Sequence, residues 1–211
     1  MSLRSSPTPS ALLLEATAQD RLFRSARTPK AFLADPVTEE RLAAVVDLVK
    51  WGPTMTNAQP LRVLLARDAD ARERVIDRLL PYNRERAANA PVLAVFCADL
   101  AFDRFGASIF PNPGMSALYE DDAFRERVAD SQAWLQVGYW IIGVRAAGLD
   151  VLPMMGFDTA SMDELLRSLT DAPFPGADLR SIMVAAIGHA DPTSYPPQSP
   201  RLDVDDVVAD L

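Results

Sequence analysis

An amide-rich loop is the first feature of the sequence that could carry chemistry. Asn57 and Gln59 stand two residues apart, and Pro53 and Pro60 enclose them within the stretch 51–60. The prolines restrict the backbone, and each amide side chain offers one acceptor oxygen and two N–H donors. Such a pair suits the edge of a planar ring that carries both carbonyl and N–H groups. An ordinary turn built from its usual residues is the alternative.

A basic segment lies upstream of this loop. Arg24, Arg27 and Lys30 supply three cations within seven residues, and Ser25 and Thr28 supply two hydroxyl groups. Charge combined with hydrogen-bond donors suits a terminal phosphate group. However, the segment directly follows a predicted helix, and the helix dipole alone favours cations at a C-terminal end. From the spacing, a phosphate site and a solvated basic helix end are equally good interpretations.

The remaining reactive residues exclude several classes of enzyme. His189 is the only histidine and Cys97 the only cysteine, so an internal disulfide, an all-cysteine metal site and the usual catalytic zinc sets cannot be built. We therefore expect no metal. There is no G-x-G-x-x-G fingerprint and no P-loop, and no G-x-S-x-G elbow supports a serine hydrolase built on His189. We expect the chemistry to depend on a bound cofactor and His189 to be a packed residue at a strand end.

Composition and charge predict one globular, cytoplasmic domain. The chain has 211 residues, of which 49% are apolar and 24% are charged, as in ordinary globular proteins. The net charge of −8 argues against nucleic acid as the main partner. The longest nearly apolar stretch, 133–144, is too short to span a bilayer, and residues 1–20 lack the apolar core of a signal peptide. We expect a flexible leader at 1–10, a single domain over 11–211, and no membrane partner.

Hydrophobic periodicity and capping residues predict the elements that position these groups. The continuous apolar run Pro91–Ala98 predicts a central strand covered on both faces. The stretch Phe102–Glu120 has no sustained period and predicts a long irregular loop, interpreted as a substrate-side lid. Helices outnumber strands, which favours a mixed sheet packed between helices. The other predicted elements are helices over Ala11–Ser25, from the cap Thr38 to the stop at Gly52, over Ala69–Leu80, Asp121–Ala147 and Ser161–Leu169, strands over Leu61–Ala66 and Leu179–Gly188, and an extended tail after Asp191 with a helix from Val204.

In their order along the chain, these motifs resemble the FMN-dependent nitroreductase family over about residues 22–208. Four stations carry the resemblance: the basic segment, the amide-rich loop, Asn83 with Arg86 after it, and the run 153–158, which reads Pro-Met-Met-Gly-Phe-Asp. In the family, a backbone N–H of the last station meets the flavin N5. The resemblance implies that the cofactor is bound by Arg27, Thr28, Lys30, Pro53, Thr54, Met55, Asn57, Gln59, Asn83, Arg86, Met155, Gly156 and Arg201.

The resemblance also implies a fold, an assembly and a reaction. The fold is α+β and nitroreductase-like, with a mixed, mostly antiparallel sheet between helices in three α-β-α layers. FMN would lie at the interface of a homodimer, and the apolar stretch Trp134–Val144 is either a dimer surface or a core helix. NADH or NADPH would pass hydride to the flavin N5 and leave, and a small acceptor would follow in the same slot, in a ping-pong reaction. No side chain need act as a nucleophile, and Lys30 or Arg86 would stabilise charge on the reduced flavin.

Within the family, the sequence is most similar to the branch of malonic semialdehyde reductases, which form 3-hydroxypropionate. The segments 51–54, 153–158 and 200–202 carry this similarity together with Asn83. An anionic acceptor in an acidic protein needs a local cation, which either Arg104 or Arg86 could supply. The alternatives are a broad-specificity nitro or quinone reductase and, from another class, a non-catalytic FMN-binding protein.

Two departures concern the phosphate. Ala26 stands where the family commonly has an arginine, and only Arg201 remains of a Lys-x-Arg pair near the end of the chain. One phosphate cation of the family pattern is therefore missing from the sequence motifs.

Overall fold

The computed structural model describes residues 12–169 and 173–210, so the leader expected at 1–10 and the predicted helix start at Ala11 lie outside it. The strands are β1 (Leu61–Ala66), β2 (Val92–Asp99), β3 (Asp150–Met154) and β4 (Leu179–Gly188). The helices are α1 (Ala16–Gln19), α2 (Glu39–Val49), α3 (Ala69–Ile76), α4 (Pro81–Ala87), α5 (Gly106–Ile109), α6 (Asp122–Ala146), α7 (Thr159–Ser168) and α8 (Val204–Val207).

The four strands form one sheet in the order β1-β2-β4-β3, and every pairing between them is antiparallel. All eight residues of β2 are buried, as its continuous apolar run predicted. The edge strand β3 was not predicted as a strand. It is short and contains Pro153, which cannot donate to a ladder and is tolerated at a sheet edge.

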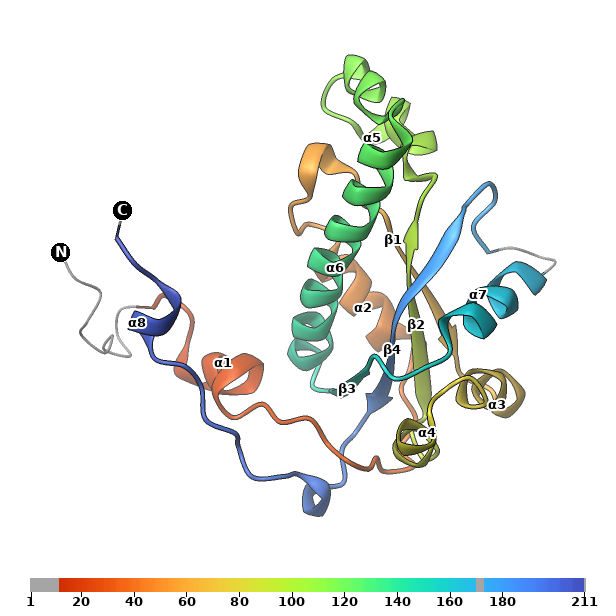
Figure 1. Cartoon of the computed structure of the whole chain (residues 1–211). Coiled ribbons are helices and arrows are strands. Elements are labelled where there is room, and N and C mark those ends of the chain that lie inside the picture. Colours follow the sequence, from red (N-terminus) through yellow and green to blue (C-terminus); the bar gives the residue numbers. More distant parts are fainter. Residues whose placement is uncertain (1–11, 170–172, 211) are drawn as a thin grey trace.

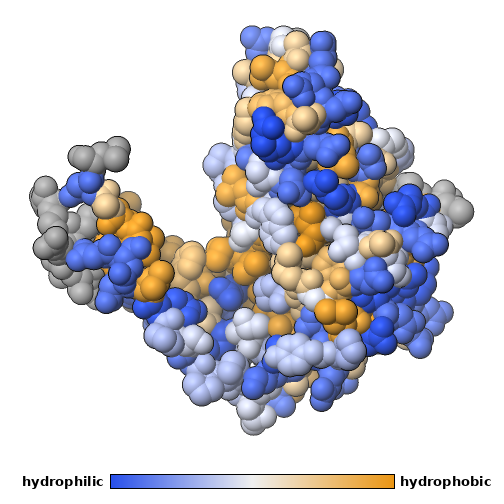
Figure 2. Space-filling view, in the orientation of Figure 1, coloured by the Kyte–Doolittle hydropathy of each residue, from blue (hydrophilic) through white to orange (hydrophobic). Residues whose placement is uncertain are grey.

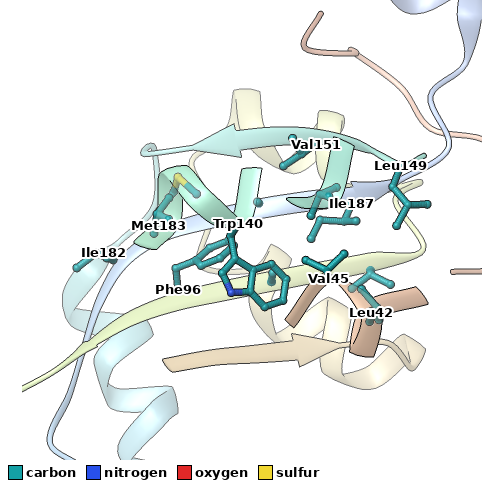
Figure 3. Close-up of a cluster of buried hydrophobic side chains, with 14 of the residues drawn as sticks. Leu42, Val45, Phe96, Trp140, Leu149, Val151, Ile182, Met183 and Ile187 are labelled. Carbon is teal, nitrogen blue, oxygen red and sulfur yellow. The ribbon is translucent and has the colours of Figure 1, made fainter. Parts of the chain in front are cut away.

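Helices cover both faces of the sheet, with α2 and α6 on one side and α3, α4 and α7 on the other (Figure 1). Successive strand residues point to opposite faces, so Phe96 packs toward α6 and Val95 toward α7. The ring of Trp140 meets Phe96 edge-on, with centroids 5.6 Å apart (Figure 3). The expected three-layer α+β fold is therefore confirmed, whereas the described sheet is entirely antiparallel and not mixed.

One side of α6 belongs to this core, and another side is open. Val137, Trp140 and Val144 are buried, whereas Trp134 and Leu135 are exposed to 37% and 41%. The core interpretation of Trp134–Val144 therefore holds for one stripe of the helix.

Local capping explains most helix starts. The Thr38 hydroxyl accepts from the N–H of Arg41 at 3.3 Å and opens α2. The predicted helix start at Ser161 is wrong, because α7 begins at Thr159 with Asp158 as its cap, which accepts from the N–H of Ser161 at 3.0 Å. The predicted helix Ala69–Leu80 ends at Ile76, and α4 follows it, opened by a proline at its first turn.

The two ends of the chain form an arm beside the body (Figure 1). The predicted helix Ala11–Ser25 is shorter than expected, since it begins at Ala16 and continues as a π-helical turn, Asp20–Arg24. The Gln198 amide donates to the carbonyl of Arg24 at 2.8 Å and ties the tail to this turn.

The stretch Phe102–Glu120 is not an irregular loop. It folds into a 3-10 turn (Phe102–Phe105), α5 and a second 3-10 helix (Pro113–Tyr119). Phe102, Phe110 and Tyr119 are buried there and form a separate core cluster with Val128 and Ala129 of α6. Clusters of aromatic side chains, rather than a regular period, order this segment. No helix within the described ranges is long and apolar enough to cross a membrane.

Candidate functional site

A cavity lies at the base of the arm, between the basic segment and the tail. It has a volume of about 650 Å³. None of the described residues that line it carries a carboxylate. The lining includes Thr28 and four arginines, Arg24, Arg27, Arg145 and Arg201. Within the described chain, these arginines make no ion pair. Four unpaired guanidinium groups favour an anion with several acceptor oxygens, such as a phosphate group.

Arg145 is the residue of this cavity that sequence reasoning missed. It lies in the last turn of α6, and its guanidinium donates to the carbonyl of Leu22 at 3.1 Å. Arg21 donates to the carbonyl of Arg145 at 3.0 Å, so hydrogen bonds in both directions connect the arm to α6. Burial lowers the pKa of Arg145, and the charge of Asp150 opposes that shift. Lys30 is exposed and does not line the cavity.

Asn83 and Gly156 meet although they are far apart in the sequence. The Asn83 amide and the backbone N–H of Leu80 both donate to the carbonyl of Gly156, each at 2.9 Å. No described residue accepts a hydrogen bond from the N–H of Gly156. A Cβ at Gly156 would lie 2.7 Å from the Asn83 amide nitrogen, so a larger residue would have to displace the Asn83 side chain or the turn. The turn therefore presents a fixed, unpaired donor.

The side chains around this turn are open to solvent. Met155 is 62% exposed and Tyr82 63% exposed. The guanidinium of Arg86 lies over the Tyr82 ring, 3.9 Å from its centroid. Tyr82 and Arg86 lie on α4, the helix whose Asn83 contacts the Gly156 turn, so both are candidates for contact with a ligand bound at that turn.

The amide-rich loop has an unusual backbone. Thr56, Asn57 and Gln59 have φ angles of 52°, 60° and 44°, in a left-handed region that non-glycine residues seldom adopt. We expected these two amides to hydrogen-bond to the edge of a ring. They also bind each other, because Gln59 Nε2 donates to Asn57 Oδ1 at 2.8 Å. The loop is tied to α6 as well: Gln132 accepts from the N–H of Met55 at 2.8 Å, and the Tyr139 hydroxyl donates to the carbonyl of Pro53 at 3.0 Å.

The loop and the Gly156 turn lie at opposite edges of the sheet. The loop leads into β1 and the turn follows β3, and these are the two edge strands in the order β1-β2-β4-β3. In Figure 1, α4 lies at the lower end of the sheet and α5, which contacts the loop, at the upper end. One chain therefore does not bring all the predicted cofactor residues together.

Two further candidates have structural roles. Arg104 is not available to a substrate, because its guanidinium lies 2.5 Å from the buried carboxylate of Asp99 and also donates to the carbonyl of Ala101 at 2.7 Å. The Arg104 guanidinium is therefore paired rather than solvated. His189 is half-buried at the end of β4 with its Nε2 3.5 Å from Arg41, which fits a packed residue at a strand end.

The protein is α+β, and the arginine-lined cavity and the Gly156 turn are separate candidate positions for a phosphate and for a planar ring. The family model described as the nitroreductase family matches residues 23–195. The chain belongs to the nitroreductase family.

Relatives and solved structures agree with this assignment. A protein of Streptomyces griseus, named as a candidate NADH dehydrogenase/NAD(P)H nitroreductase, is 40% identical over 199 residues, covering 93% of this chain and 97% of that protein. A relative from Leptothrix cholodnii with the same name is 37% identical over 200 residues, covering 94% and 98%. A nitroreductase-type protein of Exiguobacterium sibiricum, solved in complex with FMN, superposes with a TM-score of 0.75 at 16% identity, covering 90% of this chain and 95% of that one. At that identity, the superposition shows the fold.

The family assignment confirms the family recognised from the sequence, the fold, and the class of enzyme, an NAD(P)H oxidoreductase. The branch within the family stays a prediction. The residues present also fit FMN, the cofactor expected of the family. The arginine cavity supplies a phosphate site without competing carboxylates, and the Gly156 turn supplies an unpaired N–H that a larger residue would displace.

Proposed function

We propose that this protein is an FMN-dependent NAD(P)H oxidoreductase whose physiological acceptor is malonic semialdehyde or a similar short aldehyde acid. The observation that carries the proposal is the cavity with four arginines. When bound, FMN would take hydride from NADH or NADPH and deliver it to the acceptor. The side chains of the protein would bind and orient FMN and supply positive charge beside it.

Each group of residues has a separable task. The four arginines and Thr28 would hold the phosphate through charge-assisted hydrogen bonds. Asn83 would keep the Gly156 turn rigid, so that its N–H points at a constant position on the ring. Arg86, which makes no ion pair within the described chain, would place positive charge beside the ring. No side chain need form a covalent bond.

Two points support a short acidic acceptor. The similarity to the malonic semialdehyde reductase branch is spread over three segments of the chain. Of the two cations that could receive a carboxylate, Arg104 is paired with Asp99, whereas Arg86 lies over the face of Tyr82 and makes no ion pair within the described chain.

Binding of the cofactor is tested on the purified protein. We expect a yellow protein with the absorbance of bound FMN, and fluorescence titration of the apoprotein should give saturable quenching. A protein that stays colourless and does not quench added FMN contradicts the proposal.

The acceptor is tested by NAD(P)H consumption with malonic semialdehyde, nitrofurazone and a quinone in parallel. Arg86→Gln should raise KM for the semialdehyde more than for the uncharged quinone, and Arg74→Gln, an exposed arginine on α3, should change neither. Fast reduction of nitrofurazone without any rate on the semialdehyde favours the broad nitro or quinone reductase. FMN binding without turnover on any acceptor favours the non-catalytic binding protein.

We also propose that the active species is a homodimer. The loop at 53–60 lies far from the Gly156 turn within one chain, so a second copy could complete the site. The surface carries much apolar area for such a contact: Phe23, Trp51, Leu202 and Val207 are 59%, 79%, 74% and 67% exposed. Figure 2 shows a hollow between the arm and the body, with apolar surface along it.

Analytical ultracentrifugation with detection at the flavin absorbance tests this proposal. Dilution should release FMN and dissociate the dimer over the same concentration range. A fully active monomer that retains FMN would contradict it.

A further inference from the structure

The left-handed residues of the amide-rich loop need an external support. Thr56 is the most unusual of the three, because its φ is 52° and its side chain is β-branched. A β-branched residue in this region clashes with its own backbone, and such a conformation persists only where the surroundings over-determine it. The question is which residue outside the loop holds Thr56.

Tyr119 is that residue. Its hydroxyl is hydrogen-bonded to Thr56 Oγ1. The Thr56 hydroxyl lies 2.7 Å from the carbonyl of Met55 and has a single proton to donate. If that proton goes to Met55, Tyr119 donates to Thr56 and the two bonds form one chain. The Thr56 hydroxyl is then held on both sides.

The Tyr119 ring is itself immobilised. The residue is 1% exposed, and its ring meets Phe102 edge-on at 4.9 Å and Phe110 at 5.4 Å between centroids. Arg125 of α6 donates to the carbonyl of Tyr119 at 2.8 Å. The hydroxyl therefore has a fixed position from which it can define that of Thr56.

A second contact runs from the same segment to the same loop. The Asn57 amide donates to the carbonyl of Ile109, at the end of α5, at 2.8 Å. Arg104 anchors the start of the segment to Asp99. The stretch 102–119 therefore supports the loop and does not have the contacts of a free lid.

We infer that Tyr119 is a positioning residue for the FMN-facing loop: its hydroxyl holds Thr56 in the left-handed conformation and thereby presents the loop to the cofactor. This inference rests on the proposed function for its cofactor part. Its structural part, the conformation of residues 54–59, can be measured without FMN.

The test compares Tyr119→Phe with Ser108→Ala. The first variant removes only the hydroxyl and keeps the ring in its aromatic cluster. The second removes a hydroxyl of the same segment that donates to the carbonyl of Phe105 at 2.8 Å and makes no hydrogen bond to the loop. Hydrogen exchange of the apoprotein should become faster at residues 54–59 in Tyr119→Phe only.

With FMN, Tyr119→Phe should weaken binding about 3- to 10-fold, the range of one net hydrogen bond, and should shift the flavin midpoint potential and visible spectrum. Ser108→Ala should leave all three at wild-type values. In a Thr56→Gly background the loop can adopt φ near 52° without support. Adding Tyr119→Phe there should change FMN affinity much less than it does in the wild-type background.

The outcomes distinguish the positioning role of Tyr119 from the proposed FMN-dependent function. Unchanged exchange at 54–59 in Tyr119→Phe overturns the positioning role, whether or not FMN binds. A lower melting temperature with unchanged FMN affinity, potential and spectrum shows a purely structural tyrosine and also overturns it. A wild-type protein that binds no FMN overturns the proposed function and the cofactor part of the inference, while faster exchange at 54–59 would still support the structural part.

Discussion

The side-chain amide of Asn83 donates to the carbonyl of Gly156 at 2.9 Å, and a Cβ on Gly156 would lie 2.7 Å from the same amide nitrogen. This contact joins α4 to the turn after β3 and leaves the N–H of Gly156 free. The close approach explains why glycine occupies the position.

Gly156→Ala should displace the turn. We expect a loss of about 1–3 kcal/mol in unfolding free energy, as for overpacking of a close-packed site, together with weaker FMN binding. Gly138→Ala is the matched control, because a Cβ at Gly138 in α6 meets no described atom within 4 Å. That change should be neutral or should stabilise the helix by up to about 1 kcal/mol. Urea denaturation and FMN titration of both variants measure the contrast, and equal effects would contradict the role of the turn.

Arg145 should contribute to FMN affinity through the phosphate alone. Arg145→Ala removes a cation of the cavity that also receives Arg27 and Arg201, and a charge-assisted hydrogen bond is worth about 1.5–3 kcal/mol. We expect FMN to bind about 10- to 100-fold more weakly, with little change for riboflavin, which lacks the phosphate. Arg74→Ala, on the opposite face of the sheet, is the control. Equal weakening for FMN and riboflavin would show instead that the change disturbs the arm.

Asp99 should be essential for stability. Its side chain is fully buried, and its carboxylate lies 2.9 Å from Arg62 and 2.5 Å from Arg104. Burial lowers the pKa of Arg62, and the charge of Asp99 opposes this shift. Asp99→Asn leaves two cations without a counter-charge, which should cost about 3–5 kcal/mol of unfolding free energy.

The control for that change is Asp47→Asn. Asp47 pairs with Lys50 on the surface of α2, and its side chain is 75% exposed. An exposed pair contributes about 0–1 kcal/mol, so urea denaturation should barely separate this variant from wild type. A small effect of Asp99→Asn would mean that Arg62 and Arg104 find other partners.

Tyr195 should make stability fall at high pH. Burial, followed by its hydrogen bond to Asp150 at 2.9 Å, raises the pKa of Tyr195 from 10.0 to about 12. The unfolded chain then loses this proton before the folded chain does, so the contribution is complete below pH 10 and is lost as the pH rises toward 12. Tyr195→Phe should lack this part of the alkaline decline.

Ultraviolet titration of the tyrosinate signal provides the direct measurement. The difference between wild type and Tyr195→Phe should show one step near pH 12, and a step near pH 10 would contradict the assigned environment. Urea denaturation of both proteins at pH values between 10 and 12 gives an independent check, because the unfolding free energy should decline more in wild type than in Tyr195→Phe.

The sequence by itself determined the elements whose signals are local. The apolar runs of β2 and β4 predicted buried strands because a strand covered on both faces carries mostly apolar side chains. Thr38 predicted the start of α2 because a cap depends on residues three positions away. The family was recognisable for a similar reason, since each of its stations is a short run with a distinctive backbone requirement.

Tertiary structure decided what depends on distant segments. Arg145 joins the arginine-lined cavity only because the turn Asp20–Arg24 packs on the end of α6, and no spacing in the sequence reports that contact. Arg104 was predicted as a substrate cation, but the end of β2 places the Asp99 carboxylate beside it.

The same holds for the stretch 102–119. It has no helical period because aromatic packing orders it, and its role as a support depends on the bond from Tyr119 to a residue 63 positions earlier in the chain. Local patterns report which backbone conformations a segment favours. They do not report which partner a buried polar group or an unpaired charge will meet, and in this protein those partners separate the groups left free to bind a ligand from those that hold the fold.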